Sequence, residues 1–146
     1  VSVVLHLLGS PRVDAVRATG QAILQPGIED EVHVELGFDG GASAHLHCSW
    51  IWPDNIRRTT VIAEREMLVY DEVAGTVTVH RSSFAEDLSH AAEGAEVVEF
   101  EPVRPLEVEC RHFLDMVATR GNPLPDGANG VAVVEVLQRA QEALRA

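Results

Sequence analysis

Alternating apolar and polar residues mark the clearest element of the chain, a hairpin between residues 32 and 49. The first strand carries apolar residues at every second position: Val32, Val34, Leu36 and Phe38. The second strand does the same after Asp39-Gly40-Gly41: Ala42, Ala44, Leu46 and Cys48. A three-residue loop keeps these side chains on one face, because a one-residue slip would turn each strand over. This register predicts a polar face on which His33 lies opposite His47 and Glu35 lies opposite His45.

Strand character also occurs in five other segments, at residues 13–24, 58–63, 67–71, 76–80 and 96–101, which contain β-branched or aromatic residues. Residues 81–93 are small, polar and acidic, so we expect a surface loop there. The helical signals lie at the two ends of the chain. Leu5 to Leu8 resemble the end of a helix, and Gly9 suits its C-terminal cap.

Two amphipathic helices are predicted near the C-terminus. Apolar residues of the first form one stripe: Leu106, Cys110, Phe113, Leu114 and Val117. The second has Asp126 as a candidate N-cap, an expected Glu135–Arg139 pair and these inward residues: Val133 or Val134, Leu137, Ala140 and Leu144. The element order predicts an α+β fold, a mostly antiparallel open sheet of about six strands. We expect the helices to pack on one face and leave the other available for subunit contact.

The N-terminal segment, Val1 to Gly9, is typical of the second half of a helix, since no capping residue or first turn precedes it. We therefore expect the chain to be part of a longer protein. A length of 146 residues fits one domain with a hydrophobic core. The expected organisation is a single domain over residues 1–146.

Charge and composition narrow the range of partners. The net charge is −12, with 11 Lys and Arg against 23 Asp and Glu and no basic run. Binding to nucleic acid or to an anionic membrane surface is therefore not expected, since both need a basic face. The two cysteines, Cys48 and Cys110, lie far apart in the sequence and are predicted to be small buried residues. A reducing compartment, hence the cytoplasm, is expected.

Motifs that would bind a dinucleotide or activate a serine nucleophile do not occur in the sequence: it has no GxGxxG, no GxxxxGK[ST] and no GxSxG. No catalytic or cofactor-binding residue is therefore assigned. His33, Glu35, His45 and His47 raise the alternative of a metal-ligand set on the polar sheet face. The favoured interpretation is that these imidazoles pair with Glu35 on a polar or subunit-facing surface, so no metal ligand is assigned.

The segment after the hairpin contains the remaining candidates. Trp50 and Trp52 lie on the same side of a strand end, where they would pack locally, stack on a sugar ring or meet another subunit. Arg57 and Arg58 are expected in a solvated turn, with a clamp for phosphate or carboxylate as the alternative.

Two motifs resemble the Gfo/Idh/MocA family of oxidoreductases. The first is Pro105-Leu106-x-x-Glu109-Cys110-x-His112-Phe113-Leu114-Asp115, followed by Gly121-Asn122-x-Leu124-x-Asp126-Gly127. The second is Ser49-Trp50-x-x-Pro53-x-x-x-Arg57-Arg58, followed by Met67-Leu68-Val69-Tyr70-Asp71. The first is similar to the end of the family's second domain, and the second is similar to the sheet of members that act on sugars. The resemblance covers nearly the whole chain.

The resemblance implies that this is a C-terminal substrate-binding and oligomerisation domain without its N-terminal Rossmann domain. Members transfer hydride between NAD or NADP and a hydroxyl-bearing carbon of a sugar, with catalytic residues that do not occur in this chain. The chain alone is therefore expected to be inactive and to hold no cofactor. Ser2 lies where many members carry an aspartate. The Glu64-Arg65-Glu66 turn departs from the family, which often has a glycine there.

The resemblance also divides the candidate residues between two roles. Substrate-side candidates are Ser2, Trp50, Trp52 and Arg57. Subunit-interface candidates are His33, Glu35, His45, His47 and Trp52, on an open face that would form a homo-oligomer. Two alternatives remain: a standalone non-catalytic module that oligomerises or binds a sugar, and a small metal-binding sheet protein.

Overall fold

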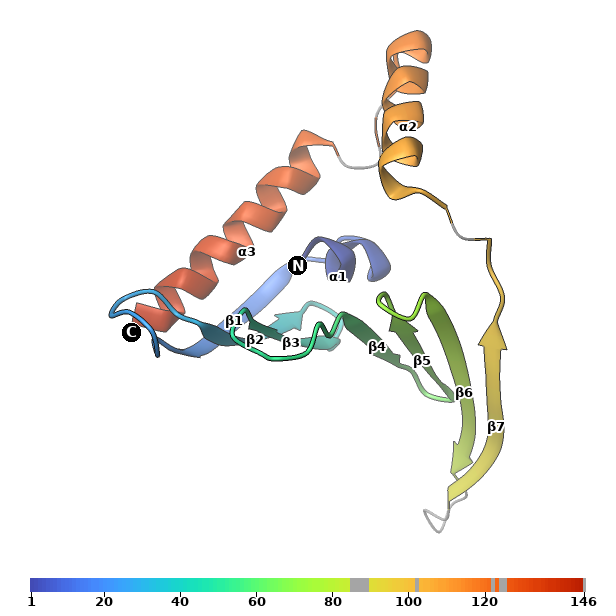
Figure 1. Ribbon diagram of the computed structural model, residues 1–146, viewed down its shortest axis with the longest axis horizontal. Coiled ribbons are helices and arrows are strands. Elements are labelled where there is room, and N and C mark those ends of the chain that lie inside the picture. The colour runs from blue at the N-terminus through green and yellow to red at the C-terminus, as the bar shows by residue number, and fades with distance from the viewer. Residues whose placement is uncertain (85–89, 102, 122, 124–125, 146) are drawn as a thin grey trace. The chain divides into compact units, whose positions relative to one another are not determined.

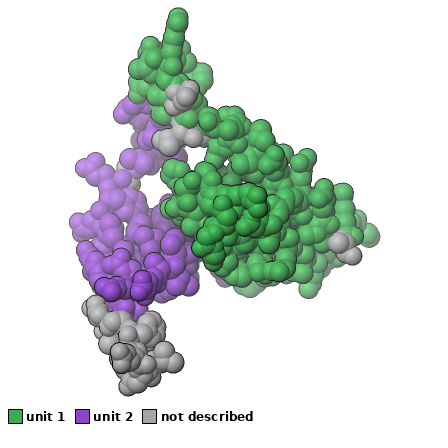
Figure 2. All heavy atoms as spheres, turned by 180° about the vertical axis from the view of Figure 1, so that it is seen from behind, with its two compact units in different colours: residues 1–52, 112–146 green, residues 53–111 purple. Residues whose placement is uncertain are grey.

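The computed structural model describes residues 1–84, 90–101, 103–121, 123 and 126–145. These residues form two compact units, coloured separately in Figure 2. Unit 1 comprises residues 1–52 and 112–146, and unit 2 comprises residues 53–111. Figure 1 labels the helices and strands.

Unit 1 is built on a three-stranded antiparallel sheet of order β1-β2-β3. Its strands are β1 (Val13–Gln21), β2 (Glu31–Phe38) and β3 (Ser43–Ser49). The predicted hairpin register is confirmed, with His33 opposite His47 and Glu35 opposite His45. The loop closes through a hydrogen bond from Phe38 N to Ala42 O, 3.0 Å long. Gly40 and Gly41 have φ angles of 89° and 87°, which side chains with a Cβ rarely adopt.

Two helices cover the apolar face of this sheet. They are α1 (Ser2–Leu7) and α3 (Gly127–Arg145), and α3 contacts β1 along its length (Figure 1). The core joins both helices to the sheet through Leu5, Leu36, Phe38 and Val136, which are 0–5% exposed. As predicted, Gly9 follows the end of α1 with a positive φ of 74°. Asp126 immediately precedes α3, and its Oδ1 accepts from Asn129 N at 2.8 Å, so the predicted N-cap is confirmed.

The buried side of α3 differs in part from the predicted side. Val136 and Ala140 are buried, whereas Val134 and Leu137 are 53% and 52% exposed. The predicted Glu135–Arg139 pair is also wrong. Arg139 instead donates to the backbone oxygens of Val13 and Asp14 at 2.7 and 3.0 Å. Because these carbonyls have no side-chain signature, this helix-to-strand contact could not be read from local spacing.

Unit 2 is a four-stranded antiparallel sheet of order β4-β5-β6-β7. Its strands are β4 (Arg58–Ile62), β5 (Glu66–Asp71), β6 (Thr76–Phe84) and β7 (His90–Val98). Ion pairs link neighbouring strands. Arg81 of β6 contacts Glu66 on β5 at 3.0 Å and Glu96 on β7 at 2.8 Å, and this draws the guanidinium pKa upward through its hydrogen bonds to Glu96 and then Glu66.

The surface loop predicted at residues 81–93 is wrong. Strand β6 continues to Phe84, and β7 starts at His90 and ends at Val98, earlier than the predicted end at residue 101. Residues 85–89 lie outside the described residues. The loop prediction failed because backbone pairing between β6 and β7 does not require apolar side chains. The small, polar composition therefore gave no strand signal.

Helix α2 (Pro105–Thr119) spans the boundary between the units. The predicted Glu107–Arg111 pair is present at 3.0 Å. No α2 residue is buried, and the apolar stripe remains exposed, with Phe113 and Leu114 at 66% and 65%. Cys110 on this helix and Cys48 on β3 are both exposed, so their predicted burial is wrong. The α+β class with antiparallel strands is confirmed, and the described strands are distributed over two sheets.

Candidate functional site

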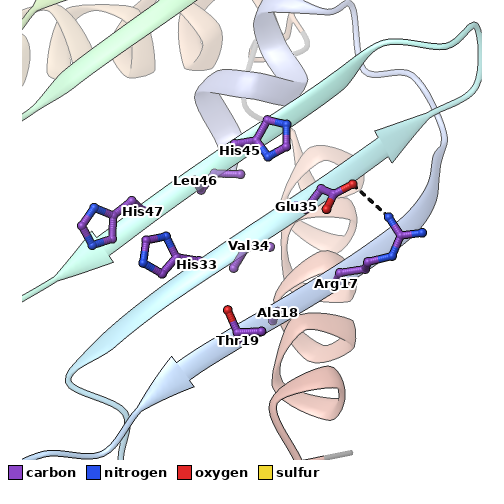
Figure 3. Close-up of a pocket in the computed structure, with 9 residues that line it drawn as sticks. All are labelled: Arg17, Ala18, Thr19, His33, Val34, Glu35, His45, Leu46 and His47. Atoms are coloured by element: carbon purple, nitrogen blue, oxygen red, sulfur yellow. Dashed lines mark hydrogen bonds and ion pairs between the residues drawn. The ribbon is translucent and has the colours of Figure 1, made fainter.

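The polar face of the β1–β3 sheet carries a shallow groove of about 320 Å³ (Figure 3). It lies on the side of the sheet opposite to the helices, because the apolar side chains of the same strands pack against the core. The residues that line the groove come from all three strands: Arg17, Ala18, Thr19, His33, Val34, Glu35, His45, Leu46 and His47. The face predicted for subunit contact is therefore a hollowed, chemically mixed surface.

At one end of this groove, Glu35 is held by Arg17. The two residues are directly opposite each other on β2 and β1, and Arg17 Nη1 donates to Glu35 Oε1 at 2.9 Å (Figure 3). His45 lies opposite Glu35 on the other neighbouring strand, but no hydrogen bond joins them in the described structure. The predicted pairing of imidazoles with Glu35 is therefore wrong, because the guanidinium is the stronger partner for the carboxylate.

At the other end, two imidazoles approach the carboxylate of Glu31. His47 Nε2 lies 2.8 Å from Glu31 Oε1, and His33 Nε2 lies 3.4 Å from the same oxygen. The two rings are stacked, with centroids 4.3 Å apart and an interplanar angle of 6°. Sequence reasoning missed Glu31. The available signal was its position two residues before His33, which places both on one strand face.

Trp52 lies beside this cluster. Its ring meets that of His47 edge-on, with centroids 6.0 Å apart and an angle of 89°. Trp52 is 51% exposed, so it does not pack into the core. The structure thus brings together four of the predicted interface residues on one sheet face and places Trp52 next to them.

Trp50 is fixed by a buried carboxylate. Its Nε1 donates to Asp30 Oδ1 at 2.9 Å, while the side chain remains 66% exposed. Asp30 is 1% exposed, and its Oδ2 accepts from the backbone nitrogens of Ile23 and Leu24 at 2.6 and 2.7 Å. The pKa of Asp30 is lowered, chiefly by the Leu24 N–H, although burial opposes the shift. No motif in the sequence predicted this contact.

The other two substrate-side candidates lie elsewhere. Ser2 is the first residue of α1 in unit 1, and it is exposed. Arg57 belongs to unit 2, where its Nη1 lies 3.0 Å from Glu72 Oε1. Arg58 is paired with Asp71 at 2.9 Å. Both guanidinium groups therefore already have carboxylate partners, which weakens the predicted clamp for an external anion.

Residues 1–69 match a family model described as the GFO/IDH/MocA C-terminal domain. This match covers slightly less than half of the 146-residue chain. The matched residues include both strands of the hairpin, the two tryptophans and the first strand of unit 2. No curated protein matches the chain significantly.

Solved structures share this fold over nearly the whole chain. UDP-N-acetylglucosamine 3-dehydrogenase GnnA from Acidithiobacillus ferrooxidans aligns with a TM-score of 0.82 at 21% identity, covering 98% of this chain and 44% of its own. Aldose-aldose oxidoreductase from Caulobacter crescentus, complexed with glycerol, aligns at 0.74 and 18% identity, covering 99% and 42%. Levoglucosan dehydrogenase in complex with NADH aligns at 0.72 and 19%, covering 98% and 46%. The chain thus spans less than half the length of these solved structures.

None of the described helices is both long and apolar enough to cross a membrane.

Proposed function

We propose that this chain is the substrate-binding and subunit-contact domain of an oxidoreductase. The enzyme would transfer hydride between NAD or NADP and a hydroxyl-bearing carbon of a sugar or sugar derivative. The observation that carries the proposal is the shared fold with GnnA over 98% of this chain, at a TM-score of 0.82. The aldose-aldose oxidoreductase and levoglucosan dehydrogenase support the same substrate class.

Trp50 is the side chain best suited to hold a sugar. Indole faces bind the C–H side of a sugar ring, and they bind better when the indole does not need to be ordered first. The hydrogen bond to Asp30 fixes the Trp50 ring while leaving 66% of the residue exposed. Trp52 and Ser2 are further substrate-side candidates in unit 1. Arg57 is a weaker candidate, because Glu72 already neutralises its charge.

The polar sheet face would form the contact between subunits. An open sheet face with aromatic and charged residues suits a two-fold interface, in which the same surface meets itself. His33, Glu35, His45, His47 and Trp52 lie on or beside this face. We therefore propose a homo-oligomer that associates through the outer face of the β1–β3 sheet.

The nicotinamide would be bound outside this chain. The sequence has none of the glycine motifs that bind a dinucleotide, and the cofactor supplies the redox chemistry of such enzymes. We propose that residues 1–146 alone do not reduce NAD⁺ or NADP⁺. The two free cysteines fit a cytoplasmic location.

The test compares the 146-residue chain with the protein made from the complete reading frame that contains it. Both are assayed for NADH and NADPH formation with UDP-N-acetylglucosamine, free aldoses and levoglucosan. We expect turnover by the complete protein only. In that protein, Trp50→Ala should lower kcat/KM by about tenfold or more, since losing about 1.4 kcal/mol of ring contact has that effect.

Ile51→Ala is the control, since Ile51 is a neighbouring apolar residue that makes no hydrogen bond to the Asp30 carboxylate in the described structure. Turnover by the short chain, or no turnover of any sugar by the complete protein, would contradict the proposal. An equal loss in both variants would remove Trp50 from the substrate side.

A further inference from the structure

We propose that Glu31, His33 and His47 bind one divalent transition-metal cation of the zinc class on the polar face of the β1–β3 sheet. The three side chains offer one ligand atom each, and these atoms all lie within 4.8 Å of one another. The inference does not depend on the proposed oxidoreductase function.

The convergence of the two imidazoles is the first argument. Both Nε2 atoms approach the same oxygen, Glu31 Oε1, at 2.8 and 3.4 Å. Around a tetrahedral ion with bonds of about 2.0–2.1 Å, neighbouring ligand atoms are about 3.4 Å apart. Small side-chain rotations would therefore place an ion between the three atoms.

The backbone holds these ligands in place. Glu31 and His33 are alternate residues of β2, and His47 is directly opposite His33 on β3. Ligands carried by paired strands are positioned more precisely than ligands on loops. The Trp52 ring packs against the His47 ring, with centroids 6.0 Å apart, and so limits its movement. Little ordering is then required when the ion binds.

The stacking of the rings is the second argument. Their centroids are 4.3 Å apart, and the ring planes are within 6° of parallel. Both Nε2 atoms face the same oxygen, Glu31 Oε1. A single ion at that position can therefore be reached by both nitrogens.

The cluster also has an open side. His33 and His47 line the groove of about 320 Å³, and Glu31 and His33 line a neighbouring hollow of about 170 Å³. Water can therefore complete the coordination, as in sites with three protein ligands. Ser49 lies opposite Glu31, and its hydroxyl has no hydrogen-bond partner among the described atoms.

The types of ligand atom indicate which metal ion would bind. Two imidazole nitrogens and one carboxylate suit Zn²⁺ and its transition-metal neighbours, whereas Mg²⁺ and Ca²⁺ prefer oxygen ligands. Zn²⁺ is therefore the probe, and Mg²⁺ is the comparison ion.

The experiment titrates Zn²⁺ into the metal-free 146-residue chain, carrying no histidine tag, by calorimetry. We expect one Zn²⁺ per chain and no saturable binding of Mg²⁺. Glu31→Gln and His47→Ala should each weaken Zn²⁺ binding tenfold or more. His45→Ala is the matched control, because His45 lies two residues from His47 on the same face but outside the cluster. Its affinity for Zn²⁺ should stay within about twofold.

A second measurement needs no variant. Co²⁺ in place of Zn²⁺ should give visible absorption typical of nitrogen ligation, and one equivalent of Zn²⁺ should remove it. Circular dichroism checks that each variant is folded. The proposal is overturned by the absence of stoichiometric Zn²⁺ binding to the unmodified chain. Equal losses in His45→Ala and His47→Ala would overturn it as well, since binding would then be scattered over surface histidines.

Discussion

At the scale of single residues, Asp30 organises more of unit 1 than its place in a loop suggests. Its two oxygens accept three hydrogen bonds, from the backbone at Ile23 and Leu24 and from the indole of Trp50. It therefore joins the connection between β1 and β2 to the end of β3. A buried carboxylate is tolerated there because donors surround it.

Unit 1 should lose stability in acid as Asp30 becomes protonated. Its folded-state pKa lies below the ordinary value of 3.8. The stabilisation is therefore complete above that value and is lost as the pH falls below about 4 and through the folded pKa. Tryptophan fluorescence during urea unfolding at several pH values measures this, since both tryptophans belong to unit 1.

Asp30→Asn supplies the comparison. One of its two oxygens becomes an NH₂ group that faces a donor, so the variant should be less stable at pH 7 and less sensitive to acid. We expect its Tm to fall by roughly 5 °C or more. Unchanged acid sensitivity in Asp30→Asn would show that other carboxylates, such as Asp71 with its lowered pKa, control the response.

At the scale of elements, the packing of α3 against β1 depends on a narrow stripe of buried residues, Val136 and Ala140. Val136 is 3% exposed, and Val134 is 53% exposed on the same helix. The two guanidinium hydrogen bonds from Arg139 to the β1 backbone fix the helix along its axis. Apolar residues outside this stripe contribute little to the core.

Val136→Ala and Val134→Ala should therefore differ. Removing two buried methyl groups at Val136 should reduce the free energy of unfolding by about 2 kcal/mol. At Val134 the same change should be neutral or stabilise by up to about 0.5 kcal/mol, because alanine favours a helix more than valine. Urea denaturation of the two variants measures the difference. Equal destabilisation would mean that Val134 is also covered by packed side chains.

The hairpin was predictable because its register depends on local information, the alternation of residues and the length of one loop. The inward face of α3 was less predictable. Valines at positions 133, 134 and 136 give several plausible stripes, and the choice is made by contacts with a strand more than a hundred residues earlier in the chain.

The candidate site was likewise predictable from the sequence only in part. The facing positions of His33 and His47 followed from the register. The acidic residue that contacts these histidines could not be predicted from the register. Glu35 is directly opposite a histidine, whereas Glu31 reaches His47 diagonally. Arg17 binds Glu35, so the carboxylate of Glu35 is already paired and that of Glu31 is the one that the imidazoles contact. Its strand could be recognised from the sequence, but its pairing with β2 could not.

At the scale of the whole molecule, the polar sheet face is the surface on which assembly would depend. The chain carries a net charge of −12, so two copies repel each other except where specific contacts exist. Arg17 and three histidines make this face less acidic than the chain as a whole. Added negative charge should therefore weaken association there.

His45→Glu should shift the protein toward monomer. It places a carboxylate opposite Glu35, and in a two-fold interface the same charge would occur on both copies. The molar mass from light scattering measures the shift, which should lessen at high salt. His6→Glu on α1 is the control, because it adds the same charge to an exposed position away from the sheet face. An unchanged mass in His45→Glu would argue against assembly through this face.

The length of the loop Asp39-Gly40-Gly41 determines which side chains of β3 lie on this surface. Side chains alternate along β3, so a lengthening or shortening by one residue would exchange its two sides. The imidazoles would then point toward the helices, and the aliphatic residues would point outward. Relatives or engineered versions that keep both histidines on the outer surface should therefore change this turn by even numbers of residues, or compensate with a bulge.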